Sequence, residues 1–184
     1  IDVHLQPVLS VTDGTIAGFE ALARWGLVAP TEFVSTAEES GLIVPLGARV
    51  LDRALAHLRR LDDHLRSLPR PGATASTPLI RVAVNVSGRE LVEPTFADRT
   101  LAALTDRGLD PSRLVLELTE STLMADSPVL RRAFELFREH GISLSIDDFG
   151  TGFSNLGYLH RIPVRSLKID RSFVSQLQVQ ANMP

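Results

Sequence analysis

Short apolar runs bounded by turn residues alternate along this chain with longer segments of helical periodicity. The short runs are rich in branched apolar residues and predict buried strands. They cover residues 3–9, 16–25, 80–87, 113–119, 142–147 and 165–170. The longer segments carry apolar residues three and four positions apart, which predicts helices with one buried face. They cover residues 31–40, 46–65, 96–107 and 128–140. This order of strands and helices favours a parallel sheet with right-handed crossovers.

Turn and capping residues mark the boundaries of these elements. An Asp-Gly pair at residues 13–14 separates the first two strands and favours a tight β-hairpin. Glycines follow three of the predicted helices, at positions 41, 108 and 141, where glycine commonly ends a helix. Ser127 followed by Pro128 is a favourable start for the fourth helix. Residues 67–78 and 149–163 are rich in turn-forming residues and predict loops.

The alternation within the strands indicates how the sheet is closed. In the strand at 142–147, one face carries Ser143, Ser145 and Asp147, and the other face carries only isoleucine and leucine. The same division recurs in the strands at 80–87 and 165–170. An open doubly wound sheet normally has two apolar faces, so a sheet with one polar face favours a β/α barrel with a polar lumen. We therefore predict an α/β fold, a TIM-like β/α barrel with an N-terminal β-hairpin.

Composition narrows the class of protein. The chain has 184 residues, of which 44% are hydrophobic, which is enough for the core of a single domain. A net charge of −3 shows no basic excess, so neither DNA nor RNA is an expected partner. The absence of cysteine excludes disulfides and thiolate metal sites and is typical of a cytoplasmic protein. The first residue is not methionine, so we expect a part of a larger protein, whose other segments can include a membrane anchor.

Polar residues recur at the carboxyl ends of successive predicted strands. They are Glu20, Asn85, Glu117, Asp147, Asp148 and Lys168. The carboxyl ends of parallel strands meet at one rim of a barrel, so these side chains should gather there. Carboxylate and amide oxygens suit Mg²⁺ or Mn²⁺. Two such ions can activate water and stabilise an in-line displacement at phosphorus, and a lysine beside them can orient the water or neutralise a phosphate.

The motifs around these residues resemble those of the EAL domain, a family of bacterial cyclic-di-GMP phosphodiesterases. The matching motifs are Glu20-Ala-Leu-Ala-Arg-Trp, Asn85-Val-Ser, Glu117-Leu-Thr-Glu, Asp147-Asp-Phe-Gly-Thr-Gly-Phe-Ser and Leu167-Lys-Ile-Asp. They stand in the order and spacing of the family, and the resemblance runs from about residue 6 to residue 174. It implies an enzyme, a hydrolase that cleaves cyclic-di-GMP to linear pGpG with Mg²⁺ or Mn²⁺. Residues 1–184 would then form one EAL domain.

The resemblance also implies roles for individual residues. The metal ligands for two ions would be Glu20, Asn85, Glu117, Asp147 and Asp148. The residues in contact with the dinucleotide would be Gln6, Leu22, Arg24 and Asn155, with Arg24 as the phosphate partner. Lys168 would act beside the attacking water, together with Glu20, Asp147 and Asp148 in catalysis. Glu120 would support the loop after the aspartate pair, and the segment 149–155 would couple dimer contacts to metal binding.

Two departures from the family pattern leave alternatives open. Trp25 is followed directly by Gly26, without the short segment that family members usually carry there. The last strands of the barrel, with their further glutamate, have no counterpart, so the predicted barrel is incomplete at its C-terminal end. The alternatives are a catalytically inactive module that binds cyclic-di-GMP, a dimerisation module without a ligand, and an unrelated metal-dependent barrel enzyme of the enolase type. The resemblance implies a homodimer and a multidomain signalling protein with sensory or GGDEF-type domains.

Overall fold

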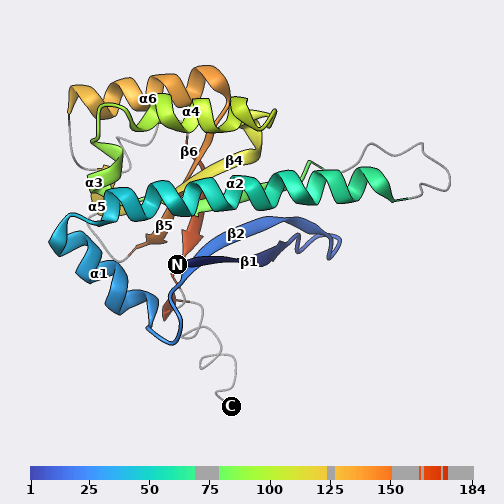
Figure 1. The fold of residues 1–184 in the computed structure, drawn as a ribbon, viewed down its shortest axis with the longest axis horizontal. Coiled ribbons are helices and arrows are strands. Elements are labelled where there is room, and N and C mark those ends of the chain that lie inside the picture. Colours follow the sequence, from blue (N-terminus) through green and yellow to red (C-terminus); the bar gives the residue numbers. More distant parts are fainter. Residues whose placement is uncertain (69–78, 124–126, 151–161, 163, 171, 174–184) are drawn as a thin grey trace, which may run out of the picture.

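The computed structural model describes residues 1–68, 79–123, 127–150, 162, 164–170 and 172–173. Their strands form one sheet in the order β1 to β6 (Figure 1). The strands are β1 (Asp2–Leu9), β2 (Ile16–Arg24), β3 (Arg81–Asn85), β4 (Leu114–Thr119), β5 (Ser143–Phe149) and β6 (Val164–Ile169). The first two strands pair antiparallel as the predicted hairpin, and β2 to β6 pair parallel, each with its neighbour in sequence.

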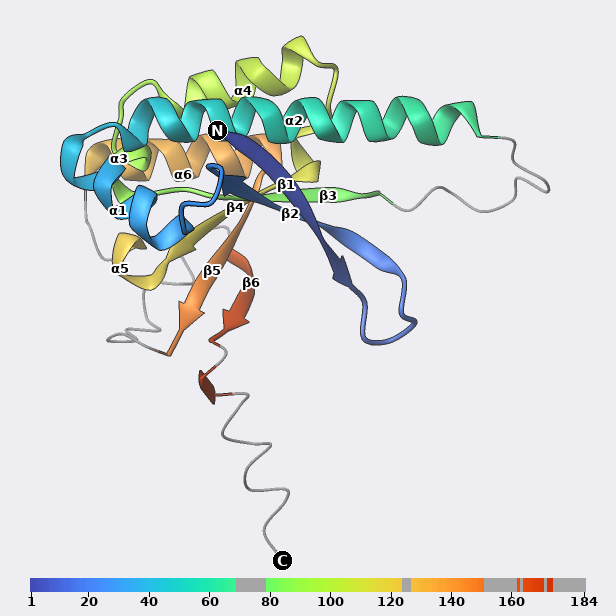
Figure 2. The same cartoon turned by 60° about the horizontal axis from the view of Figure 1, so that its bottom comes forward.

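Three helices cover one face of this sheet. They are α2 (Ile43–Ser67), α4 (Phe96–Asp106) and α6 (Pro128–His140), which lie together on the same side of the strands in both ribbon views (Figure 1 and Figure 2). The apolar residues of the strands that face these helices are fully buried, among them Val82, Val84, Leu116, Leu144 and Ile146. The opposite face carries the polar row. Within the described residues the strands β1 and β6 form the two edges of the sheet.

Local capping explains why α6 has the bounds that the sequence predicts. The side chain of Ser127 accepts a hydrogen bond from the backbone N–H of Leu130, and Pro128 occupies the first turn, where it needs no donor. Gly141 ends the helix with φ of 80°, a left-handed conformation that glycine adopts without steric cost. Buried Leu130, Ala133 and Phe137 then lie on one stripe of the helix against the sheet.

Some predicted bounds are wrong because tertiary contacts and short helices intervene. The helix α2 begins at Ile43 rather than at residue 46, directly after α1 (Pro30–Ser40) and the turn at Gly41. The strand β3 ends at Asn85 rather than at residue 87, because Ser87 caps a short helix. Three short elements were not predicted, namely α3 (Gly88–Leu91), η1 (Pro111–Arg113) and α5 (Glu120–Leu123). Of the predicted loops at 67–78 and 149–163, most residues lie outside the described part.

The outer face of β6 differs from the expectation that every branched apolar face packs under helices. Leu167 is 43% exposed and Ile169 is 66% exposed, whereas Leu144 and Ile146 on the neighbouring strand β5 are buried. The cause is positional: the main helix–strand packing of the described residues places α2 on β1, β2 and β3 and α5 (Glu120–Leu123) against β4 and β5, whereas β6 packs mainly against β5. Alternation along a strand thus identifies the residues that share a face, and the neighbouring elements decide whether that face is covered.

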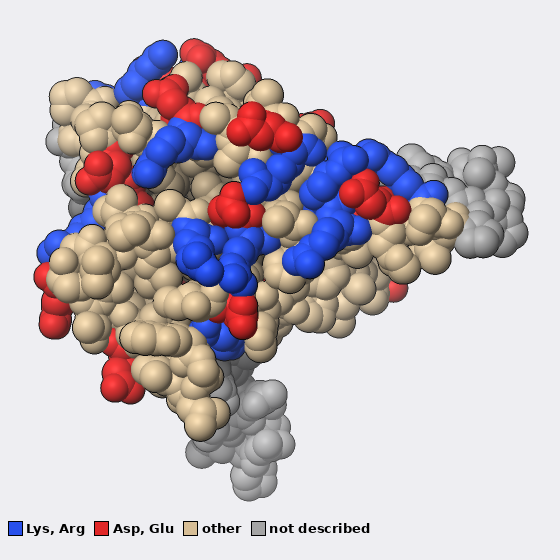
Figure 3. All heavy atoms as spheres, in the orientation of Figure 1, with Lys and Arg blue, Asp and Glu red and all other residues tan. Residues whose placement is uncertain are grey.

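Charged residues lie on the outer helix faces, where both signs alternate over the surface in view (Figure 3). One ion pair of the described residues is largely buried. Arg113 donates to both carboxylate oxygens of Asp62 and, through Nε, to the backbone oxygen of Ile80 at 2.8 Å, which ties α2 to the start of β4. The hydrogen bonds from Arg113 lower the pKa of Asp62 below its usual value, against the opposing effect of burial. Among the described helices, none combines the length and the apolar character that crossing a membrane requires.

Candidate functional site

The sheet register brings the predicted ligands onto one face. In the parallel pairs, Asn85 lies opposite Glu117, and Glu117 lies opposite Ser145, two residues before Asp147. Glu20 lies opposite Ala83, two residues before Asn85. A step of two residues keeps a side chain on the same face of a strand. The four ligand candidates therefore form a diagonal row across β2 to β5 at the carboxyl ends of the strands.

Lys168 joins this row from β6. Its Nζ donates to Glu117 Oε2 at 2.9 Å, to Glu20 Oε2 at 3.1 Å and to Asp147 Oδ2 at 3.2 Å. The Glu117 side chain is only 6% exposed, and those of Glu20 and Asp147 are 19% and 24% exposed. One ammonium from the last described strand thus connects three carboxylates from β2, β4 and β5.

The donor set of this cluster fits a divalent cation. Glu20, Glu117 and Asp147 each present a carboxylate oxygen, and these atoms lie within 4.8 Å of one another. Asn85 donates through Nδ2 to Glu20 Oε1 at 3.0 Å, which leaves its amide oxygen as a further neutral ligand. Three carboxylates and an amide oxygen form an all-oxygen set, the kind that Mg²⁺, Mn²⁺ and Ca²⁺ prefer. These residues could therefore hold a hard divalent ion.

Burial and the neighbouring charges act in opposite directions on the pKa values of Glu117 and Lys168. Burial raises the pKa of Glu117 above its usual value, the Lys168 ammonium lowers it, and the negative charges of Glu20 and Asp147 raise it further. For Lys168, burial alone would lower the pKa, but the hydrogen bond to Glu117 and the three carboxylate charges outweigh this effect and raise it. Lys168 is therefore held firmly as a cation, and the buried carboxylate of Glu117 depends on a nearby positive charge.

Asp148 adopts a position apart from the row. Its φ is 52°, the one positive φ of a non-glycine residue in the described part, and the pairing of β5 with β6 shifts register between Ile146 and Phe149. Its backbone N–H donates to Asp147 Oδ1 at 3.1 Å. Burial and the charges of Asp147 and Asp170 raise the pKa of Asp148. The structure does not include Asp148 in the 4.8 Å cluster, but its side chain lines the same cleft.

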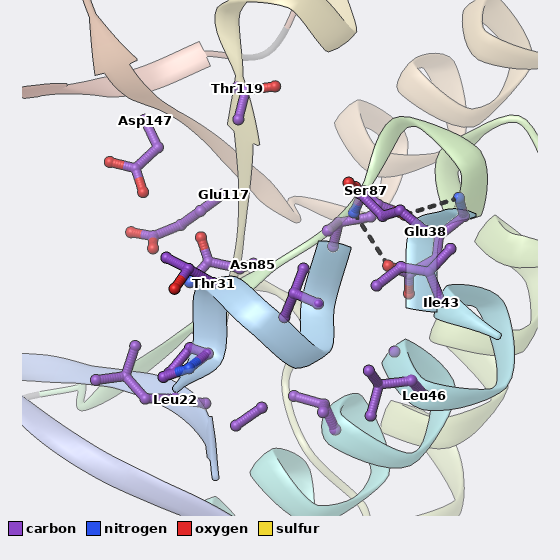
Figure 4. Close-up of a pocket in the computed structure, with 18 of the residues that line it drawn as sticks. Leu22, Thr31, Glu38, Ile43, Leu46, Asn85, Ser87, Glu117, Thr119 and Asp147 are labelled. Carbon is purple, nitrogen blue, oxygen red and sulfur yellow. Dashed lines mark hydrogen bonds between the residues drawn. The ribbon is translucent and has the colours of Figure 1, made fainter. Parts of the chain in front are cut away.

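A cleft of about 630 Å³ opens beside the cluster. Figure 4 shows Asn85, Glu117 and Asp147 at one end of this cleft and Ile43 and Leu46 at the other. Two predicted substrate residues also line the cleft, Leu22 and Arg24 at the end of β2. Arg24 donates through Nη1 to the backbone oxygen of Ala23 at 2.8 Å. The cleft therefore combines an acidic end, an apolar end and an arginine between strand and helix, a composition suited to a ligand with both phosphate and base.

Three predicted residues lie elsewhere. Gln6 is exposed on β1 directly opposite Glu20, so both side chains project to the same face, but Gln6 does not line the cleft. Glu120 begins α5, and both of its carboxylate oxygens are buried without a hydrogen-bond partner among the described residues. Asn155, like the segment 151–155 of the predicted coupling loop, lies outside the described residues.

Sequence reasoning missed Glu90, which lines the apolar end of the cleft. Its Oε2 accepts from the backbone N–H of Ser87 at 3.0 Å, while the Ser87 hydroxyl accepts from the backbone N–H of Glu90, a reciprocal pair marked in Figure 4. Burial raises the pKa of Glu90 to about 7 despite these hydrogen bonds. The carboxylate lies against Gly47 of α2, where an added Cβ would come within 1.6 Å of Oε1. The pattern Ser-x-x-Glu at 87–90 was the signal that could have identified this residue.

Comparisons with known proteins agree on one family. A family model described as the EAL domain matches residues 1–184. The cyclic di-GMP phosphodiesterase NbdA of Pseudomonas aeruginosa is 41% identical over 182 residues, covering 96% of this chain and 22% of NbdA. The bifunctional diguanylate cyclase/cyclic di-GMP phosphodiesterase MucR of the same organism is 39% identical over 180 residues, covering 95% of this chain and 25% of MucR. The chain thus spans about a quarter or less of these relatives.

Solved structures agree on the fold. The PaMucR phosphodiesterase, in a complex with c-di-GMP, is 38% identical with a TM-score of 0.82, over 96% of this chain and 69% of the other. Klebsiella pneumoniae BlrP1, in a complex with manganese and cyclic di-GMP, has a TM-score of 0.75 over 95% of this chain and 41% of the other, and its 23% identity indicates a shared fold only. The structural neighbours have a TIM-like barrel, so the predicted fold class is confirmed, with the six-stranded sheet as part of such a barrel.

Proposed function

This chain belongs to the EAL domain family, and from that premise we propose that it is a metal-dependent phosphodiesterase domain that hydrolyses cyclic-di-GMP to linear pGpG. One observation carries the proposal. Carboxylates from three parallel strands converge within 4.8 Å of one another, beside a cleft of about 630 Å³ that also contains Leu22 and Arg24. A phosphodiester flanked by two bases needs both parts, a cation site for the phosphate and an adjoining apolar surface for a base.

The proposed ligands for two Mg²⁺ or Mn²⁺ ions are Glu20, Asn85, Glu117, Asp147 and Asp148. Bound divalent ions at this position would supply an activated water and would neutralise charge on the phosphate. The donor chemistry of the cluster supports this assignment, because every ligand atom is an oxygen. Asp148 supports it through its place on the cleft wall next to Asp147.

The remaining roles belong to residues around the cluster. Lys168 provides a positive charge that orients the attacking water and stabilises negative charge on the phosphate. Arg24 binds a phosphate oxygen, and Leu22 contacts a base from the cleft wall. Gln6, on the same face as Glu20, and Asn155 bind the dinucleotide, and Glu120 supports the loop that follows Asp148.

The wider context is also a proposal. Residues 1–184 would form one EAL domain of a larger multidomain signalling protein, supported by the small share of its relatives that the chain covers. The similarity to a bifunctional relative supports a GGDEF-type or sensory domain in the same protein. We propose that the domain works in the cytoplasm and as a homodimer.

A chromatographic assay of the purified chain with cyclic-di-GMP and Mn²⁺ tests the function. The wild type should form pGpG, Glu20→Ala should form none because it removes a ligand, and Glu135→Ala, which changes an exposed carboxylate of α6, should match the wild type. Nucleotide binding by calorimetry is measured on the same samples. Binding without product would favour a cyclic-di-GMP receptor over an enzyme, and absence of both binding and product would refute the proposal.

A further inference from the structure

Lys168 is the only lysine in the sequence, although the chain contains 19 basic Lys and Arg residues in total. All other basic positions are arginine. An ammonium is a compact point charge with three donors, whereas a guanidinium is a flat fork that matches two oxygens in one plane. At Lys168 the three donors serve three carboxylates from three strands. Three contacts to separate strands therefore suit an ammonium better than a guanidinium.

Among the described residues, the oxygens of Glu20 and Asp147 that Lys168 does not contact accept hydrogen bonds from other groups. The second oxygen of Glu20 accepts from Asn85 at 3.0 Å, and the second oxygen of Asp147 accepts from the backbone N–H of Asp148 at 3.1 Å. Both carboxylates thus have a protein donor on each oxygen. A divalent ion that binds Glu20, Glu117 and Asp147 through the oxygens that face Lys168 would take the place of Nζ, which lies 2.9 to 3.2 Å from all three. Lys168 is the donor free to move, because it sits at the end of a flexible stem and its side chain is 34% exposed.

We propose that Lys168 acts as an internal counter-ion that competes with the metal for Glu20, Glu117 and Asp147, so that metal binding releases the ammonium toward the cleft. The inference rests on the proposed function, because it assumes that these carboxylates are the metal ligands. Without the metal, the ammonium offsets the repulsion among three carboxylates, one of them buried. With the metal, the same ammonium is a like charge beside the ion and weakens its binding. The released ammonium then becomes available to the water and the phosphate.

The ammonium stabilises the metal-free protein and weakens metal binding. Its removal should therefore change stability and metal affinity in opposite directions, which distinguishes this role from a merely structural one. Removal of the charge in Lys168→Gln or Lys168→Met should lower the melting temperature in EDTA. The same change should strengthen Mn²⁺ binding by about ten-fold or more, because a repulsive charge next to the ion is lost. A lysine that only supported the fold would lose stability and metal affinity together. Arg165→Gln, which removes an exposed charge from the same strand, should change neither quantity.

The experiment combines calorimetric Mn²⁺ titration of EDTA-treated protein with NMR of the wild type. Because Lys168 is the only lysine, protein labelled with ¹³C at the lysine Cε gives a single lysine signal. Addition of Mg²⁺ should shift this signal, and the titration needs no variant to fold. A wild type that binds Mn²⁺ while the lysine signal stays unchanged, or charge-removing variants that bind Mn²⁺ equally or more weakly, would overturn the inference and leave the metal site standing. A wild type that binds no Mn²⁺ would instead refute the proposed function.

Discussion

Glu90→Gln should gain stability over the wild type as the pH rises from acidic to neutral and alkaline values. Glu90 is 4% exposed and lies at the third position of α3, where its carboxylate accepts from Ser87. Burial, with a smaller contribution from Glu38, raises its pKa from 4.5 to about 7, and the Ser87 hydrogen bonds and the charge of Arg99 oppose this shift only in part. Folding therefore takes up a proton at this carboxyl between these two pH values.

The size of the effect follows from the shift. A change from 4.5 to about 7 corresponds to about 3 kcal/mol, at about 1.4 kcal/mol for each pKa unit. A raised pKa in the folded state means that this stability is fully present below pH 4.5 and is lost as the pH rises to about 7. Glutamine keeps the acceptor for Ser87 but does not titrate. The free energy of unfolding of Glu90→Gln minus that of the wild type should thus grow by about 3 kcal/mol across this interval and stay level above it.

Urea unfolding followed by circular dichroism from about pH 4.5 to 8 measures this difference. Titration of all other groups cancels, because both proteins share them. Glu93→Gln is the matched control, since Glu93 is an exposed carboxylate close by in sequence, and its profile should parallel the wild type. A difference between Glu90→Gln and the wild type that stays constant from pH 4.5 to 8 would show that the Glu90 carboxyl titrates alike in both states, and the reasoning from burial would be refuted.

Three further changes test other parts of the structure. Asp62→Asn should lower the free energy of unfolding by about 3 kcal/mol, because it leaves the buried guanidinium of Arg113 without its carboxylate, and equal urea midpoints would contradict this. Gly47→Ala should lower the free energy of unfolding by about 1–2 kcal/mol despite the better helix propensity of alanine, because the added methyl group meets the Glu90 carboxylate. In a Glu90→Ala background this loss should vanish. Glu120→Gln should keep the Mn²⁺ affinity seen by calorimetry but lower pGpG formation at least about ten-fold, and unchanged turnover would remove Glu120 from the proposed mechanism.

The elements that the sequence predicted well are those with their signals inside the element or at its ends. The helix α6 has a serine cap, a proline in the first turn and a terminal glycine, so its bounds need no tertiary information. The alternation in β5 likewise places Ser145 and Asp147 on one face because the side-chain period of a strand is two. Strand ends that share a face bring their polar residues together, so the row of Glu20, Asn85 and Glu117 could be predicted before the geometry was known.

Other features depend on neighbours that no local pattern encodes. The short helices α3 and α5 have only four residues each, too few for a helical periodicity to be visible. Alternation alone would send Asp148 to the face opposite Asp147, whereas Asp148 has a positive φ and lines the same cleft as Asp147. The exposure of Leu167 and Ile169 depends on which elements pack on β6, a property of the environment rather than of the strand. The burial of Glu90 against Gly47 likewise joins two helices and appears only in three dimensions.

The order of the strands has a consequence for how the site forms during synthesis on the ribosome. Every strand pairs with its predecessor in sequence, so the sheet can grow as the chain emerges, one strand at a time. Lys168 and Glu20 are nevertheless 148 residues apart, so synthesis of the stretch between them takes about 7–30 s at typical translation rates. The carboxylates of β2, β4 and β5 are added one after another in that interval, and the last 21 residues, from Asp147 to Lys168, leave about 1–4 s in which all three exist without the lysine. If the competition proposed for Lys168 holds, a growing chain would bind divalent cations more tightly before Lys168 joins the cluster than after it.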